Sequence, residues 1–222
     1  MRNVQILAVA AALCVCGIGG SQLSAQRAQG ATPTAAAAAA GPLRLEFASG
    51  TATYRVREEL AGIPFPTDAV GSTRAVTGTL VVNPDGSVDS AQSKITVDLR
   101  TLKSDQDRRD GYIIGDRVLD TGKFPFAEFV ARRVVGLPSP LPSGNVANAG
   151  FQIIGDMTIH GVTKPVTWNS MATFNPEIVA GRATTEFTFA TFNIPKPAFA
   201  MLLSVADTIA LELEFRFKRA GT

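Results

Sequence analysis

Two alternating runs of apolar residues, joined by one short turn, most constrain what this 222-residue chain can fold into. The runs cover residues 151–159 and 166–174, and His160-Gly161 stands between them. Alternation with a period of two is typical of a strand that buries one face, and a short glycine-containing break joins two such strands as a β-hairpin. Gly and His both tolerate the positive φ of a tight turn. We expect regular pairing of the second strand to begin after Pro165, which lacks an N–H.

Similar strand patterns recur along the chain. Further strands are expected around residues 52–60, 76–82, 91–99, 127–135, 179–189 and 209–217. With the hairpin, these segments make eight sequential strands whose outer faces are polar. A closed sheet has no free edges, so we predict an all-β fold: an eight-stranded antiparallel barrel, with a two-sheet sandwich as the alternative.

One short helix and one apolar insert interrupt the strands. Ser104 is expected to cap the helix, Asp107 to complete a capping box, and Asp105 to pair with Arg109 four residues on. Thr121-Gly122 would end this segment. The insert, residues 195–203, is unusually apolar for a loop, so its side chains are expected either to pack or to form an entry portal.

The N-terminal region predicts export. Residues 1–25 have the pattern of a secretory signal peptide, with Arg2 at the start, an apolar stretch over residues 6–15 and a cleavage site after Ala25. The protein is therefore expected in the periplasm or outside the cell. Cys16 raises the alternative of a lipid-modified N-terminus, although Val15 stands where a small residue is expected. Residues 26–42 are an Ala-rich low-complexity linker, which leaves residues 43–222 as one domain.

Composition argues against several classes of function. Both cysteines precede residue 17, so the mature chain would have no disulfide and no thiolate. Without the signal peptide, basic residues exceed acidic residues by one, which indicates no nucleic-acid partner. The apolar stretch is too short for a stable membrane span. No nucleotide or hydrolase motif occurs, so no cofactor is expected, and no metal is expected because His160, the one histidine, lies in a turn.

The inward-facing positions define the candidate ligand site. The residues expected to face the interior are Tyr54, Val56, Val76, Leu80, Ile95, Val97, Ile113, Phe129, Ile153, Met157, Val166, Trp168, Ala183, Phe187, Phe189, Ile209, Leu211 and Leu213. Several in-phase positions are small: Gly78, Ala91, Gly155, Ser170, Ala172 and Ala183. Because protein interiors pack densely, these small residues predict a cavity. The alternative is that the glycines mark bends and that side chains fill the barrel.

Three charged residues are candidates for contact with a polar headgroup. Glu58 is in phase with the inward residues of its strand, so it would either face the barrel mouth or lie in solvent beyond the strand end, and we prefer the solvated position. Arg109 and Asp110 would either form structural contacts or bind the ligand, and we prefer the structural role. Trp168 is expected in the core or in the cavity wall.

Three segments carry a resemblance to a known family. TLKSDQDRRDGYI (Thr101 to Ile113), VLDTGKFP (118–125) and GDMTIHGVTKPV (155–166), in this order, resemble the YceI-like family. The resemblance implies an exported, polyisoprenoid-binding protein with an eight-stranded lipocalin-like barrel. Its ligand would be an amphipathic lipid such as an isoprenoid quinone, a polyprenyl lipid or a fatty amide. The resemblance also implies that members can pair as homodimers.

Some residues depart from the family pattern. The region from residue 57 to 73 lacks histidine, Tyr112 stands where a His is usual, and Thr191-Phe192-Asn193 replaces Asp-Phe-Gly. The apolar architecture therefore carries over better than the polar contacts. The sequence predicts non-catalytic lipid binding or transport in the cell envelope. The alternatives are a filled interaction domain and, less favoured, an enzyme with Glu58 or Asp110 as a base.

Overall fold

The computed structural model describes residues 41–138 and 141–220. The predicted signal peptide, both cysteines and most of the predicted linker lie outside these residues. The strands are β1 (Leu43–Leu60), β2 (Thr67–Thr73), β3 (Val76–Val82), β4 (Lys94–Asp98), β5 (Lys103–Ser104), β6 (Phe126–Val135), β7 (Val146–Ile159), β8 (Val162–Phe174), β9 (Ile178–Thr188) and β10 (Leu202–Arg219). The helical segments are η1 (Leu99–Thr101), α1 (Asp107–Ile114) and η2 (Phe189–Phe192).

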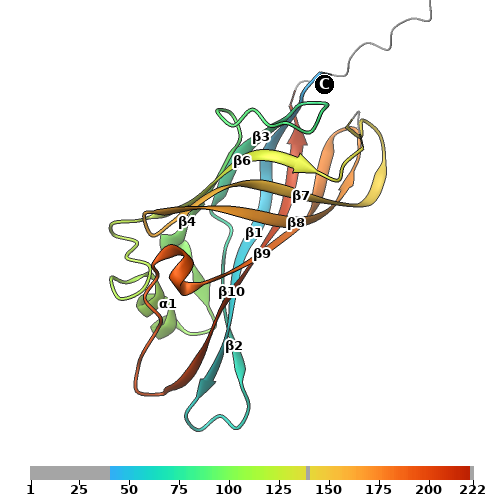
Figure 1. Ribbon diagram of the computed structural model, residues 1–222. Coiled ribbons are helices and arrows are strands. Elements are labelled where there is room, and N and C mark those ends of the chain that lie inside the picture. Colours follow the sequence, from blue (N-terminus) through green and yellow to red (C-terminus); the bar gives the residue numbers. More distant parts are fainter. Residues whose placement is uncertain (1–40, 139–140, 221–222) are drawn as a thin grey trace, which may run out of the picture. The chain divides into compact units, whose positions relative to one another are not determined.

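Eight antiparallel strands close on themselves through hydrogen bonds (Figure 1). The order is β10-β9-β8-β7-β6-β4-β3-β1, and β1 pairs again with β10. We call these eight strands the strand ring. It confirms the predicted eight-stranded antiparallel architecture. Because the first and last strands of the ring pair with each other, the ring avoids the exposed edges that promote pairing with another chain.

The predicted hairpin is present as β7 and β8. Their ladder runs to the pair Ile159 and Val162, so His160 and Gly161 alone form the turn. Their φ values are 51° and 74°, and a two-residue type I′ turn requires positive φ at both positions. The expectation for Pro165 is wrong, because Pro165 pairs with Asp156 inside the ladder. β9 pairs with β8 only over 169–174, so Pro165 has one neighbouring strand and needs no N–H on its free side.

Two strands were not predicted, and others are longer than expected. β2 and β5 lie beside the ring, where β2 pairs with the second half of β1 and β5 pairs with β2. β1 begins at Leu43, before the predicted start, and its first residues pair with β3. β10 begins at Leu202, inside the predicted insert. Phe189 belongs to η2 and not to the preceding strand.

The helix α1 is shorter than expected and begins differently. It ends at Ile114, and Gln106 is its N-cap without a side-chain hydrogen bond, so the predicted Ser104 cap and Asp107 capping box are wrong. Ser104 instead donates its Oγ–H to Asp110. The predicted ion pair between Asp105 and Arg109 is present.

Candidate functional site

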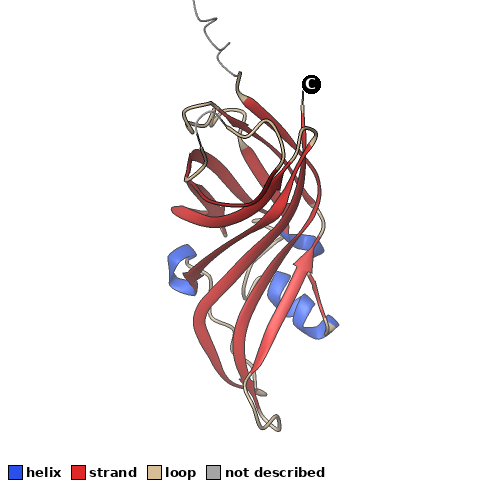
Figure 2. Ribbon diagram, turned by 90° about the vertical axis from the view of Figure 1, so that its right-hand side faces the viewer, coloured by secondary structure: helices blue, strands red, loops and turns tan. Residues whose placement is uncertain are grey.

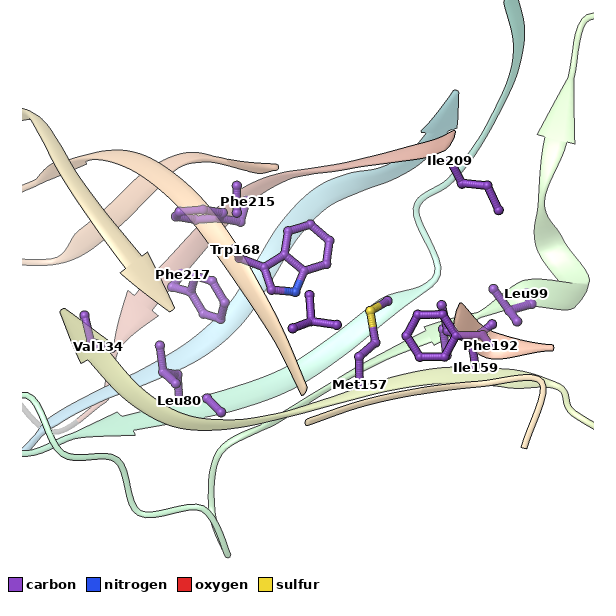
Figure 3. Packing of buried hydrophobic residues seen from close by; sticks show 14 of the residues in the cluster. Leu80, Leu99, Val134, Met157, Ile159, Trp168, Phe192, Ile209, Phe215 and Phe217 are labelled. Atoms are coloured by element: carbon purple, nitrogen blue, oxygen red, sulfur yellow. The ribbon is translucent and has the colours of Figure 1, made fainter. Parts of the chain in front are cut away.

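An apolar cavity of about 630 Å³ lies inside the strand ring. Pockets of about 300–1,000 Å³ are typical of small-molecule sites, and most such sites are apolar. Figure 3 shows the side chains of Trp168, Met157 and Phe215 directed into the interior from different strands. Trp168 packs its ring edge-on against Phe129, with 6.2 Å between the centroids. Trp168 thus forms part of the cavity wall.

Most of the residues predicted to face the interior do line this cavity. The exceptions are Val76 and Val166, which are buried in the sheet but do not line the space. The wall also includes residues that were not predicted, and five examples are Ile63, Ala69, Ser93, Leu102 and Ile194. Ala69 belongs to the unpredicted β2, and the others lie outside the regular strands, where period two gives no signal.

The small residues do not all contribute space to the cavity. A Cβ at Gly155 would lie 2.3 Å from the carbonyl oxygen of Val130 and 2.7 Å from the Phe129 ring, so neighbouring atoms already occupy that position. Gly78 has φ 148°, and a Cβ there would lie 2.2 Å from the Lys94 carbonyl oxygen. These two glycines allow close strand contact and do not open space in the cavity. Ala91 is exposed, which corrects its predicted inward position.

Ala172 and Ala183 do face inward. Both are almost fully buried, and Ala183 lines the cavity from β9. Its neighbours across the ladders are Leu213 and Ser170. A methyl group at this position leaves room that a larger side chain would occupy. Ala183 is therefore one of the positions that keep the interior open.

An ion pair between the buried Glu58 and the partly buried Arg109 adds charged groups to the cavity wall. The preferred interpretation of Glu58 as a solvated residue is wrong, because Glu58 is only 5% exposed and lines the cavity. Arg109 of α1 donates from Nη2 to Glu58 Oε1 at 2.8 Å. Arg109 also pairs through Nη1 with the exposed Asp105. A buried carboxylate needs such a partner, because desolvation strongly disfavours an isolated charge.

Tyr54 lies next to this charged group and over a glycine. A Cβ on Gly71, its partner in β2, would lie 2.3 Å from the Tyr54 ring, so the ring covers the glycine. Burial raises the pKa of Tyr54 from 10.0 to about 12, and the positive charge of Arg109 partly opposes this shift. The phenol therefore stays protonated and neutral at physiological pH, and it adds a hydroxyl group to the cavity wall.

Asp110 is placed for structure and not for ligand contact. It is buried outside the cavity lining, and it accepts hydrogen bonds from Ser104 N and Oγ, both at 2.7 Å. Lys103 Nζ lies 3.3 Å from its other oxygen. Burial alone would raise the pKa of Asp110, but the hydrogen bonds from Ser104 and the positive charge of Lys103 outweigh it and lower the pKa. The preferred structural interpretation of Asp110 agrees with these contacts.

The mouth of the cavity lies between α1 and the segment before β10. Figure 1 shows this orange-red segment beside α1. Tyr112 Oη donates to the Ala198 carbonyl at 3.0 Å and accepts from Ala198 N at 3.1 Å. Its ring packs edge-on against Phe199, with 5.6 Å between the centroids. Phe199 and Met201 line the cavity and are also exposed to solvent.

The described residues contain neither a metal-binding cluster nor a helix suited to span a membrane. Within residues 41–138 and 141–220, no three His, Cys, Asp or Glu side chains come together in a way that could hold a metal ion. In the same part of the chain, no helix has the length and apolar character needed to cross a membrane.

Comparison with known proteins identifies the family. The model of the YceI-like domain matches residues 45–217, which is most of the chain. This chain belongs to the YceI-like family. A UPF0312 protein of Pseudomonas putida is 42% identical over 94 residues, and that match covers 40% of this chain and 43% of the relative. A UPF0312 protein of Vibrio vulnificus is 31% identical over 80 residues, covering 36% and 38%. The chain thus spans less than half the length of these curated relatives.

Solved structures have the same fold at low sequence identity. The Campylobacter jejuni YceI protein has a TM-score of 0.57 and 12% identity, over 73% of this chain and 91% of that one. Burkholderia cenocepacia BcnA has a TM-score of 0.54 and 16% identity, over 75% and 95%. A polyisoprenoid-binding domain from Saccharophagus degradans has a TM-score of 0.53 and 10% identity, over 78% and 99%.

The YceI-like motifs of this chain contact one another. The Phe124 ring lies edge-on to His160 with 4.9 Å between the centroids, and a Cβ at Gly161 would approach that ring to 2.6 Å. The motif turn therefore packs on the Phe124-Pro125 motif. Asn193 has φ 51°. Besides Gly, Asn is one of the few residues that visit this left-handed region routinely.

Proposed function

We propose that this YceI-like protein binds one amphipathic lipid non-covalently, with the apolar chain of the lipid inside the strand ring. The observation that carries the proposal is the apolar cavity, whose lining includes the buried Trp168 and Phe215 and also the exposed Phe199. The Saccharophagus degradans neighbour is a polyisoprenoid-binding domain, and the same class of ligand fits an interior of this size. An isoprenoid quinone, a polyprenyl lipid or a fatty amide meets the requirement.

The orientation of the lipid follows from where the polar groups lie. Glu58 of β1 and Arg109 of α1 line the cavity with Tyr54 next to them, and most of the other lining residues are aromatic or aliphatic. The headgroup would therefore remain near the Glu58–Arg109 pair, and the chain would extend toward Trp168. A bound chain is worth about 0.8 kcal/mol for each methylene that leaves water.

The same site supports binding better than catalysis. Glu58, the inward carboxylate that could have served as a base, is held by Arg109 in an ion pair. Asp110 accepts two hydrogen bonds from Ser104 and does not line the cavity. We infer a carrier or sequestering protein, and the pattern of residues 1–25 supports a location in the periplasm or outside the cell. The filled-barrel alternative is not favoured, because the interior holds a cavity.

A chain-length series tests the proposal. Delipidated protein would be titrated with fluorescent fatty amides of increasing length. Affinity should rise about fourfold for each added methylene until the cavity is full, and then level off. An affinity that does not depend on chain length would contradict the proposal.

Two tryptophan substitutions on β9 provide the matched control. Ala183→Trp places an indole in ligand space, so binding should weaken while the ligand-free protein keeps a urea midpoint near that of the parent. Ala180→Trp adds the same side chain on a residue that does not line the cavity, so binding should not change. In a filled interior, Ala183→Trp would instead overpack the core, which typically costs about 1–3 kcal/mol.

A further inference from the structure

Exposed apolar side chains gather beside the cavity mouth. Five of them define a surface that we call the apolar lip: Ile63, Phe65, Phe199, Met201 and Leu203. They include more than half of the large apolar side chains that are exposed within residues 41–138 and 141–220. Phe65 is 76% exposed and Leu203 is 67% exposed. Clustering of this kind marks an interaction site, whereas single exposed apolar residues need no explanation.

The apolar lip comes from two segments that are fixed side by side. The turn after β1 and the segment that leads into the first residues of β10 are joined by a hydrogen bond from Ala61 N to the Met201 carbonyl at 2.8 Å. Leu60 pairs with Leu202 in the ladder next to it. Figure 2 shows the β1–β2 hairpin projecting beyond the helices. The backbone contacts between these two segments thus hold the apolar side chains of the lip next to one another at the surface.

Neither segment carries a charge that would oppose entry into an apolar medium. Residues 60–66 read LAGIPFP and residues 197–203 read PAFAMLL. Pro64, Pro66 and Pro197 have no backbone N–H, so they have no donor that would lose a hydrogen bond to water in an apolar medium. Of the other donors, Ile63 N bonds to Leu60 and Leu202 N bonds to Phe199 within the segments. Unsatisfied backbone groups are what make loops costly in lipid, and here several are already satisfied or absent.

The apolar lip is also continuous with the cavity. Ile63, Phe199 and Met201 belong to the lip and to the cavity lining, whereas Phe65 and Leu203 belong only to the lip. A lipid chain that entered past these residues would pass from one apolar surface to the next. This continuity favours a bilayer, which is itself the source of such chains, over a protein partner.

We propose that the apolar lip docks on the surface of a phospholipid bilayer, where its side chains enter the headgroup region and the cavity mouth faces the lipids. This inference rests on the proposed function, because docking would serve to bring lipids to the cavity. Docking itself can be measured independently of lipid binding in the cavity. The mixed charges of the flanking residues, such as Glu59, Lys196 and Asp207, indicate that docking depends on apolar contact and not on anionic lipids.

Co-sedimentation with sucrose-loaded phosphatidylcholine vesicles tests the inference. The full chain would be compared with Phe65→Ser/Leu203→Ser, so that residues 1–40 are the same in both proteins. Because the variant loses the apolar burial of two large side chains, its partitioning should fall at least about tenfold. Met171→Ser/Val146→Ser is the matched control, because both residues are exposed and apolar, lie on β8 and β7, and do not line the cavity. Its partitioning should equal that of the parent.

Three results would overturn the inference. These are absence of vesicle binding by the parent protein, equal binding by the lip variant, and an equal loss in the control variant. Sedimentation velocity without lipid provides the remaining check. If the lip variant converted a dimer to a monomer but kept its vesicle binding, the apolar lip would cover a second copy of the chain and not a bilayer.

A solution titration separates this inference from the proposed function. Phe65 and Leu203 do not line the cavity, so the lip variant should bind a fluorescent fatty amide as tightly as the parent does. If the parent failed to bind that probe, the proposed function would fail while the vesicle result still decided docking. Circular dichroism of both double variants should match the parent.

Discussion

The buried Glu58–Arg109 pair predicts an unequal response to removal of its two partners. In Arg109→Met, the Glu58 carboxylate is left 5% exposed and loses the ion pair that compensates its charge. An uncompensated buried charge typically costs about 3–5 kcal/mol. In Glu58→Gln, by contrast, Arg109 keeps its ion pair with Asp105. The free energy of unfolding should then fall by no more than the contribution of one charge-assisted hydrogen bond, about 1.5–3 kcal/mol. The fall is smaller than this full contribution because the Gln amide oxygen can still accept a hydrogen bond from Arg109.

Urea unfolding of ligand-free protein measures both values. We expect the free energy of unfolding to fall by about 3–5 kcal/mol in Arg109→Met and by about half as much in Glu58→Gln. The double variant should be more stable than Arg109→Met alone, because it buries no unpaired charge. Coupling energies for contacting residues are about 0.5–3 kcal/mol.

Two controls make the asymmetry interpretable. Asp105→Asn alone should change stability by under about 1 kcal/mol, because its carboxylate is exposed. When Asp105→Asn is combined with Glu58→Gln, however, the loss of unfolding free energy should approach that of Arg109→Met, because Arg109 then has neither carboxylate as a partner. Equal losses in Glu58→Gln and Arg109→Met, or full additivity in the double variant, would refute the reasoning.

Three further predictions concern pH, the turn and the mouth. Burial raises the pKa of Tyr54 from 10.0 to about 12, so the folded state keeps a proton that the unfolded state loses. The resulting stability is complete below pH 10 and is lost as pH rises toward 12, and Tyr54→Phe should flatten this part of the pH dependence of the urea midpoint. Gly161→Ala should lower stability by about 1–3 kcal/mol, because φ is 74° and the Phe124 ring occupies the Cβ position, whereas Gly144→Ala, where no atom lies within 4 Å, should be neutral by urea unfolding. Phe199→Asp should slow lipid loading in a stopped-flow assay and leave the circular dichroism intact, and collapse of the fold would show that Phe199 is core.

The parts of the fold that the sequence predicted are those in which large side chains alternate. The hairpin of residues 151–174 and the last strand have this pattern, and both are confirmed. β2 lacks it, because its buried residues, Ala69, Gly71 and Thr73, are small. The Tyr54 ring of β1 fills the space over Gly71 of β2. The large side chain of this strand pair therefore comes from β1, and the sequence of β2 shows no alternation of large residues.

The polar part of the site could not be predicted for a different reason. Whether Glu58 is solvated or buried depends on Arg109, which lies 51 residues away in the chain. A capping pattern around Ser104 was visible, but Asp110 binds the Ser104 hydroxyl and removes it from that role. For Glu58 the outcome depended on a contact distant in the sequence, and for Ser104 it depended on a side chain six residues away.

Solvent extraction followed by mass spectrometry tests the central claim most directly. Protein would be purified without detergent from cells that produce it and then extracted into organic solvent. We expect an amphipathic lipid in amounts comparable to the protein from the parent and from Ala180→Trp, and much less from Ala183→Trp. Extracts that contain no such lipid, or equal amounts of lipid from all three proteins, would contradict the account that the cavity is a lipid-binding site.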